Sequence, residues 1–191
     1  MDETTRPPFP TPLYAGLLDE LKAEFPSFAI RYKETSRLQR AIHVALKLVT
    51  FGGMRVYLTG YYTVLFGTLW VPESWDRLDD VDRVILLRHE RVHLRQRKRM
   101  GDVGMAFVYL LPFFPLGLAY GRARIEWEAY TETLRATHEH YGIGAAKGLR
   151  AHVVGRFVGP DYGWMWPFRK TVERWFDEVI AELSRESSST D

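Results

Sequence analysis

The sequence contains no cysteine, and this absence limits both its stabilisation and its chemistry. Disulfide bonds are excluded, and any bound metal must be held by histidine and carboxylate side chains. The excess of positive charge is also small, since 26 Lys and Arg face 24 Asp and Glu for a net charge of +2. This balance argues against nucleic acid as a natural partner. A hydrophobic fraction of 46 % in 191 residues indicates a folded chain with a substantial core.

The N-terminus lacks the basic start and the apolar run of a secretion signal, because its first residues are acidic and prolines follow. We therefore expect a cytoplasmic protein with a flexible, proline-rich lead-in over residues 1–12. The remaining sequence predicts one domain over residues 13–184 and a disordered, serine-rich tail over residues 185–191.

Hydrophobic periodicity predicts a mainly helical domain of the α+β class. Leucines at helical spacing predict a helix over residues 13–25, and a capping box at Ser36 and Gln39 predicts a second helix that ends at Gly52-Gly53. Residues 54–72 are rich in β-branched and aromatic side chains, which predicts a small antiparallel sheet of two or three strands. We expect this sheet to pack on a metal site built by two helices. Further helices are expected over 79–100, 122–142, 145–158 and 172–183.

Residues 88–96, Arg-His-Glu-Arg-Val-His-Leu-Arg-Gln, contain the pattern H-E-x-x-H. On a helix, His89 and His93 leave the same face, because four residues make a little over one turn. Both imidazoles can then bind one zinc ion, and Glu90 stands beside them as the candidate base for a metal-activated water. The histidines share their helical face with the apolar Ile85 and Val92 and with Gln96, so their imidazoles need partners in the interior.

Two histidines do not complete a catalytic zinc site, which usually has three protein ligands. Two glutamates of the next predicted helix, Glu126 and Glu128, are candidates for the third position, and their spacing places them on opposite faces. Glu128 lies on a strongly charged face, whereas Glu126 shares a less charged face with Tyr130 and Thr133. A buried carboxylate needs a cation, so we predict Glu126 as the third ligand.

The string His89-Glu90-Arg91-Val92-His93, followed by Glu126-x-x-Ala129, resembles the gluzincin group of zinc metallopeptidases. It is most similar to the compact, minigluzincin-like forms, and the resemblance covers roughly residues 54–142. It implies that the two histidines and Glu126 bind zinc and that Glu90 is the general base. It also implies a peptide or protein substrate.

One residue of this chain differs from the group's pattern, and one role that the group requires has two candidate residues. The aspartate that usually orients the first histidine is replaced by Tyr130, whose hydroxyl can accept the same hydrogen bond. The group also needs an electrophile that stabilises the oxyanion beside the metal. Tyr162 and His152 are the two candidates by their position after the third ligand.

Residues 103–121 form an uncharged, apolar stretch between the predicted ligands. Its length reaches the roughly 18 residues of a membrane span. However, a single crossing would separate the two histidines from Glu126, and two prolines interrupt any straight helix. We therefore expect a buried hairpin or pocket wall, with a shallow peripheral membrane contact as the alternative.

The sequence as a whole predicts a zinc-dependent metallopeptidase that hydrolyses peptide bonds with a zinc-activated water and Glu90 as general base. The alternative is a catalytically inactive zinc-binding domain that acts as a membrane-associated or protein-interaction module. The basic run at 95–99 fits a solvated helix end that complements the helix dipole better than a nucleic-acid surface. Cleavage specificity and oligomeric state are not encoded in any pattern of this sequence.

Overall fold

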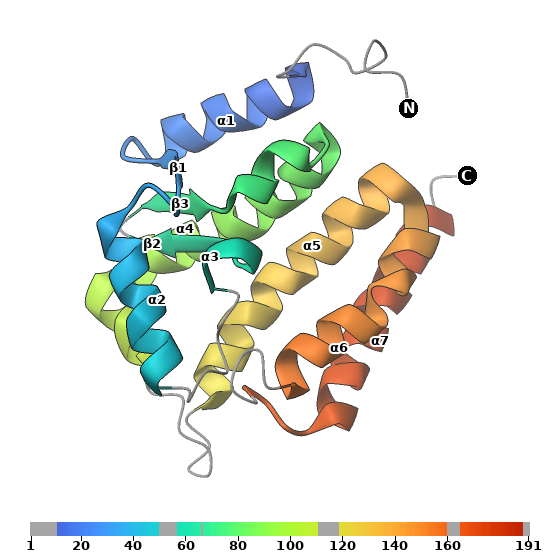
Figure 1. Ribbon diagram of the computed structural model, residues 1–191. Helices are drawn as coiled ribbons and strands as arrows, with labels where there is room; N and C mark the ends of the chain where they lie inside the picture. Colours follow the sequence, from blue (N-terminus) through green and yellow to red (C-terminus); the bar gives the residue numbers. More distant parts are fainter. Residues whose placement is uncertain (1–10, 50–56, 66, 111–118, 160–164, 189–191) are drawn as a thin grey trace. The chain divides into compact units, whose positions relative to one another are not determined.

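Helices dominate the structure, a computed structural model, and a small sheet accompanies them (Figure 1). This confirms the predicted α+β class. The chain forms two compact units, Met1–Leu87 and Arg88–Asp191. The expectation of a single domain over residues 13–184 stays a prediction. The structure describes residues 11–49, 57–65, 67–110, 119–159 and 165–188.

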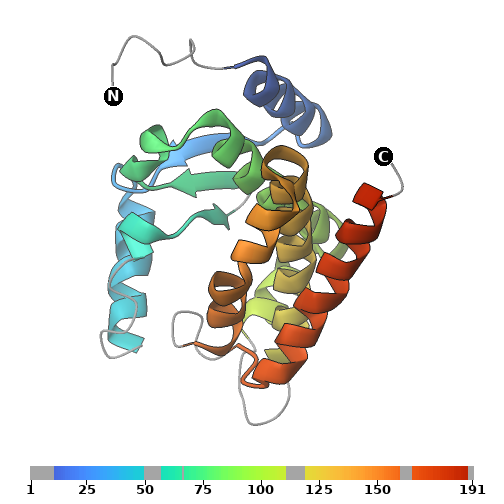
Figure 2. The same ribbon diagram turned by 90° about the vertical axis from the view of Figure 1, so that its right-hand side faces the viewer.

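The first unit contains a three-stranded sheet in the order β1-β3-β2 (Figure 2). Its strands are β1 (Ala29–Tyr32), β2 (Thr63–Leu65) and β3 (Thr68–Val71). Strand β1 runs parallel to β3, with Ala29 opposite Thr68, and β2 runs antiparallel to β3, with Leu65 opposite Thr68. The antiparallel pairing predicted within residues 54–72 is confirmed for β2 and β3, whereas the parallel strand β1 was not predicted and makes the sheet mixed. The four residues of β1 are too few to show a period of two in the sequence.

The helices of the first unit follow their capping signals. Helix α1 (Pro12–Glu24) begins after Thr11, whose side chain accepts a hydrogen bond from the Tyr14 amide. Helix α2 (Arg37–Val49) begins at the predicted capping residue, since the Gln39 amide donates to Ser36 Oγ at 3.3 Å. Its predicted end at 52–53 lies outside the described residues.

A short helix, α3 (Tyr57–Gly60), occupies part of the segment that was predicted as a strand. The strand predicted over residues 54–59 is wrong for residues 57–59, and residues 54–56 lie outside the described part of the chain. Propensity for β structure mainly measures how a side chain fits a half-buried pleated surface, so it does not fix the backbone by itself.

The helix with the H-E-x-x-H pattern is α4 (Asp80–Leu110), which begins in the first unit and continues in the second. It follows the 3-10 helix η2 (Glu73–Arg77) and starts where predicted, since the Asp82 amide donates to Asp79 Oδ1 at 2.8 Å. The buried Arg83 fixes this start by donating to the Trp75 carbonyl. Gly101 interrupts the helical backbone with a φ of 72°, next to the predicted end at residue 100.

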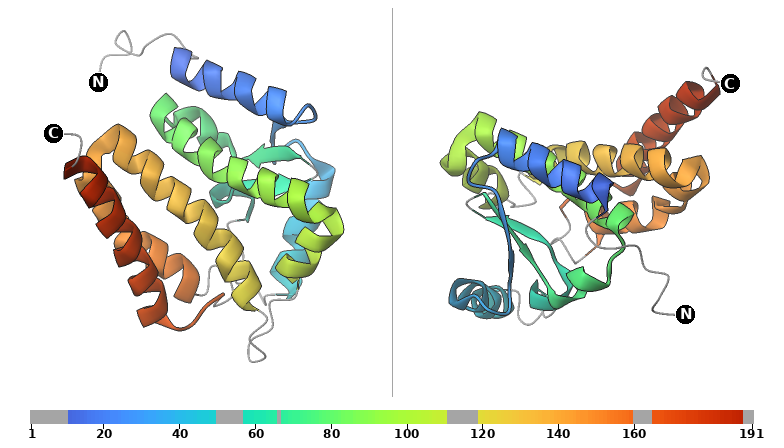
Figure 3. Two further views of the ribbon diagram at one scale, coloured as in Figure 1. Left: turned by 180° about the vertical axis from the view of Figure 1, so that it is seen from behind. Right: turned by 90° about the horizontal axis from the view of Figure 1, so that it is seen from above.

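The second unit also contains α5 (Ala119–Gly148), α6 (Arg150–Val158) and α7 (Arg169–Ser188), which pack against one another (Figure 3). Gly142 breaks α5 at the predicted position with a φ of 81°. Helix α7 reaches Ser188, so residues 185–188 of the predicted disordered tail are helical. The core of this unit is built largely from the following buried side chains: Ala123, Trp127, Leu134, Val153, Phe157, Val172, Trp175, Phe176 and Leu183.

The apolar stretch 103–121 is only partly described. Residues 103–110 continue α4, residues 119–121 begin α5, and residues 111–118 lie outside the described part. The side chains of Val103 and Phe107 are 84 % and 65 % exposed, so the prediction of a buried hairpin is wrong for these two. Within the described residues, no helix combines the length and the hydropathy needed to cross a membrane.

Candidate metal centre

Three potential metal ligands lie together on α4 and α5 of the second unit. His89, His93 and Glu126 each offer one ligand atom, and these atoms lie within 4.8 Å of one another. The two Nε2 atoms of the histidines are 3.2 Å apart, and His93 Nε2 is 3.7 Å from Glu126 Oε2. Ligand atoms at about 2.1 Å from a tetrahedral zinc ion are about 3.4 Å from each other. These two spacings are therefore close to those of a zinc site.

The predicted difference between the two glutamates of α5 is present in the structure. Glu126 is 4 % exposed, whereas Glu128 is exposed. The exposure of the two side chains differs because a separation of two residues places them about 200° apart around the helix axis. The helical face thus brings the predicted third ligand to the histidines. Its binding of zinc stays a prediction.

The ring nitrogen of His89 that faces away from His93, Nδ1, contacts Thr133. His89 Nδ1 lies 2.9 Å from Thr133 Oγ1, and that hydroxyl lies 3.2 Å from the Ala129 carbonyl oxygen. Tyr130 instead stands edge-on to the His89 ring, with centroids 5.1 Å apart and an interplanar angle of 81°. The expectation that Tyr130 supplies the acceptor at Nδ1 is therefore corrected. Thr133 follows Glu126 by seven residues, or two turns, and so lies on the same face.

The ring nitrogen of His93 that faces away from His89, Nδ1, contacts Gln96. His93 Nδ1 lies 2.9 Å from Gln96 Oε1, and Gln96 Nε2 donates to the Ile125 carbonyl at 3.0 Å and to Glu128 Oε2 at 2.9 Å. Gln96 is buried. The contact between Gln96 and His93 was not predicted from the sequence. The available signal was the position of Gln96, a polar residue three positions after His93 on the helical face of the histidines.

Burial makes the site favour neutral imidazole at His89. The pKa of His89 is held well below its usual range by desolvation and then by the positive charge of a protonated His93, against the effect of a backbone hydrogen bond at Ala129. A neutral imidazole has a free nitrogen lone pair, which is the form that binds metal. Glu90 is also buried, at 6 % exposure, and it is not one of the three clustered ligands.

Next to the cluster, Arg88 joins α4 to α5. Its Nε lies 2.6 Å from Glu132 Oε1 and its Nη1 lies 2.5 Å from Glu139 Oε2. Burial opposes the charge of Arg88, but the hydrogen bonds to both carboxylates raise its pKa overall. In return, the hydrogen bond from Arg88 lowers the pKa of Glu139. These contacts tie the helical turn before His89 to the helix that carries Glu126.

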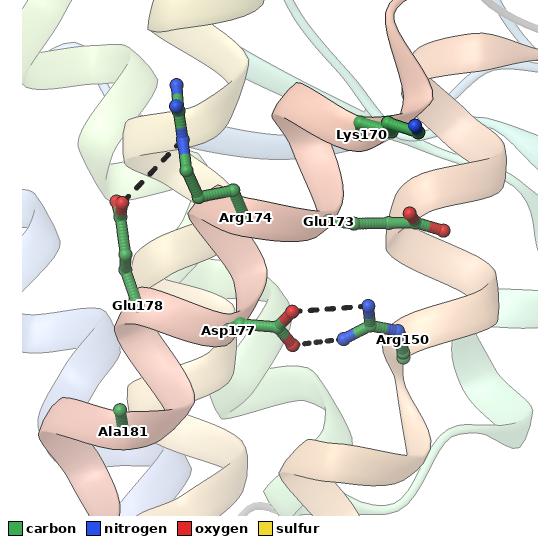
Figure 4. A pocket seen from close by; sticks show the side chains of 7 residues that line it. All are labelled: Arg150, Lys170, Glu173, Arg174, Asp177, Glu178 and Ala181. Carbon is green, nitrogen blue, oxygen red and sulfur yellow. Dashed lines mark hydrogen bonds and ion pairs between the residues drawn. The ribbon is translucent and has the colours of Figure 1, made fainter.

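Of the two candidates for oxyanion stabilisation, only His152 lies within the described residues. His152 lies on α6 with an exposed side chain, and Tyr162 lies outside the described residues. A surface hollow of about 500 Å³ is present on α6 and α7 (Figure 4). Two ion pairs lie among its lining residues, Arg150 with Asp177 and Arg174 with Glu178. This hollow shares no residue with the cluster on α4 and α5, so we assign the candidate site to the cluster.

Comparison of the chain with protein-family models, with curated proteins and with solved structures finds no match. The similarity to gluzincins therefore rests on the motif residues and on the way α4 and α5 bring them together. Membership of that group stays a prediction.

Proposed function

We propose that this chain is a zinc-dependent metallopeptidase whose metal is held by His89, His93 and Glu126. The main support for the proposal is that one ligand atom from each of these three residues lies within 4.8 Å of the other two, in a largely buried site. Two imidazoles and one carboxylate are a ligand set found in catalytic zinc sites, and three protein ligands leave a fourth position for water or substrate. The proposed location of the enzyme is the cytoplasm, as the sequence predicts.

Zinc in such a site supplies a Lewis acid that activates water at neutral pH. We propose that the Glu90 carboxylate would accept a proton from the attacking water as the water oxygen bonds to the peptide carbonyl carbon, and would pass this proton to the leaving amine as the C–N bond breaks. Three features of Glu90 support this role. It is adjacent in sequence to the ligand His89, it is buried, and it is not one of the clustered ligand atoms.

The proposal is tested by measuring metal content and peptide hydrolysis of the wild type and of Glu90→Gln. The wild type should retain one zinc per chain after dialysis. Glu90→Gln should retain the metal and lose hydrolysis of a mixed peptide library by about 10²–10⁴-fold. Glu178→Gln, an exposed position on α7, is the matched control and should change neither property.

Each result decides a separate part of the proposal. A wild type that binds no stoichiometric metal at neutral pH would show that the cluster is not a zinc site. Retained zinc with unchanged hydrolysis in Glu90→Gln would remove Glu90 from the reaction while leaving the metal site intact.

A second candidate function has a separate observation in its favour. Val103 and Phe107 are largely exposed and lie one turn apart on α4, directly after a basic segment at 97–99. Apolar side chains beside basic ones suit the interface of a membrane with anionic lipids. On this basis we propose the alternative of a zinc-binding module without turnover that contacts such a membrane.

The alternative makes a distinct set of predictions. The protein should bind zinc, leave peptide libraries intact and co-float with vesicles that contain phosphatidylglycerol. The double substitution Val103→Ser and Phe107→Ser should abolish flotation, whereas Tyr141→Ser, at an exposed aromatic position on α5, should not. Peptide turnover by a protein that ignores these vesicles would exclude this function.

A further inference from the structure

Each imidazole of the cluster directs one nitrogen at the other ligands and the second nitrogen at a side-chain oxygen. His89 Nδ1 meets Thr133 Oγ1 and His93 Nδ1 meets Gln96 Oε1, both at 2.9 Å. We propose that Thr133 and Gln96 are positioning residues that fix both imidazoles in one tautomer. This tautomer carries its proton on Nδ1 and directs the Nε2 lone pair toward the position that a metal would take. The role in metal binding rests on the proposed function, whereas the tautomer does not.

The orientation of the Gln96 amide is determined by its neighbours. Its nitrogen faces the Ile125 carbonyl oxygen at 3.0 Å and the Glu128 carboxylate at 2.9 Å. A carbonyl and a carboxylate accept hydrogen bonds, so the opposite amide orientation would place three oxygens against one another. The amide oxygen must therefore face His93. Because this oxygen can only accept, His93 Nδ1 must carry the proton.

The orientation of the Thr133 hydroxyl follows from its place in α5. A helical threonine commonly donates its hydroxyl proton to the carbonyl four residues earlier, and Thr133 Oγ1 lies 3.2 Å from the Ala129 carbonyl oxygen. The hydroxyl has one proton, and this proton is used in that bond. Its lone pair then accepts from His89 Nδ1, which assigns the same tautomer to the first histidine.

These two assignments have a consequence for the space between the rings. With both protons on Nδ1, two Nε2 lone pairs face each other at 3.2 Å, beside the buried carboxylate of Glu126. Two lone pairs at this distance repel, and a cation between them removes the repulsion. Both outer acceptors, the Thr133 hydroxyl and the Gln96 amide, are uncharged. The chain thus orients both histidines without the carboxylate that commonly supports a zinc-bound imidazole.

Nitrogen NMR on the metal-free protein tests the tautomers directly. Long-range proton–nitrogen correlation spectra at a pH above 7, with chelator present, distinguish Nδ1–H from Nε2–H for each histidine. We expect Nδ1–H for both rings in the wild type and in Thr133→Ser, which keeps the hydroxyl. Thr133→Val should produce a mixture of tautomers at His89, and Gln96→Met should do so at His93.

The matched control is Thr137→Val, a buried threonine one turn further along α5, which should leave both tautomers unchanged. Thermal unfolding identifies variants that do not fold, and Thr133→Ala replaces Thr133→Val in that case. Nε2–H on either ring of the wild type would overturn the proposal. Wild-type tautomers in both the Thr133 and the Gln96 variants would overturn it as well.

Zinc affinity, measured by competition with a chromogenic chelator, tests the consequence for the metal. Loss of an outer hydrogen bond should weaken binding by about 10–100-fold in Thr133→Val and in Gln96→Met. Thr133→Ser, which keeps the hydroxyl, should have the same zinc affinity as the wild type. Unchanged affinity in both variants would overturn the positioning role. A wild type that binds no zinc would refute the proposed function, and the NMR result would still decide the tautomers.

Discussion

Replacement of Glu126 by glutamine tests the metal centre, because it removes a ligand charge with almost no change in side-chain volume. In the wild type, zinc that binds only the folded state adds about 2.7 kcal/mol when its free concentration is about 100 times the Kd. For a chain of 150–250 residues, about 1 kcal/mol changes the Tm by roughly 2–4 °C. We therefore expect zinc to raise the Tm of the wild type by roughly 5–11 °C.

The same zinc concentration should stabilise Glu126→Gln much less. The Glu126 carboxylate belongs to the group of three ligand atoms, so the variant keeps two imidazole nitrogens and an uncharged amide. Loss of an outer partner alone weakens metal binding by up to about 100-fold, and loss of a ligand charge should weaken it at least as much. With a Kd about 100-fold higher, the same zinc adds only about 0.4 kcal/mol, a Tm shift of roughly 1–2 °C.

Tryptophan fluorescence during thermal unfolding gives the measurement, because Trp127 and Trp175 are buried in the core of the second unit. Each protein is melted with chelator and with zinc, so that the zinc-dependent shift is compared within one variant. Glu178→Gln serves as the control and should keep the full shift. A full shift in Glu126→Gln would refute the assignment of Glu126 as a ligand.

The remaining predictions concern the stability of the metal-free protein, measured by urea unfolding. Burial lowers the pKa of folded His89, so stability should be complete above about pH 6.5 and fall in more acidic solution by at most about 1.4 kcal/mol per pH unit. His89→Gln should flatten this slope, and an identical slope would contradict the assignment. Arg88→Met should lose about 1–2 kcal/mol, because two carboxylates of α5 lose their partner, and Arg88→Lys should lose less. Equal losses would argue against simultaneous contact of the guanidinium with both carboxylates. Gly142→Ala should lose about 1–3 kcal/mol through its backbone conformation (φ 81°, ψ 170°), since beyond its own helical segment no atom lies within 4 Å of the added carbon. Gly144→Ala, in equally open space without a positive φ, should be neutral or stabilising. Phe157→Ala should lose about 3–5 kcal/mol by opening a cavity in the core, and a loss below about 1 kcal/mol would show that the core refills.

Local signals predicted most of the helical structure. The Ser36 and Gln39 capping contact, the start of α4 directly after Asp79 and the break of α5 at Gly142 all depend on residues close in sequence. The sheet was predicted less well, because β1 pairs with β3 across a long intervening segment. Four residues carry too little periodicity to reveal such a partner. The exposure of Phe107 was missed for a related reason, since an apolar side chain does not encode whether another element covers it.

The sequence by itself determined which groups are available to a metal. It excluded thiolates, placed His89 and His93 one helical turn apart and separated the face of Glu126 from that of Glu128. Only the tertiary structure decided that Glu126 approaches these histidines.

The tertiary structure also decided which oxygens hold the outer nitrogens of the two rings. Thr133 is 44 residues from His89, and the Ile125 carbonyl that orients Gln96 is 29 residues from it. The physical reason is that helical periodicity fixes the face of each side chain within its own helix. It does not fix the rotation and translation of α5 against α4, which the packing of both helices sets.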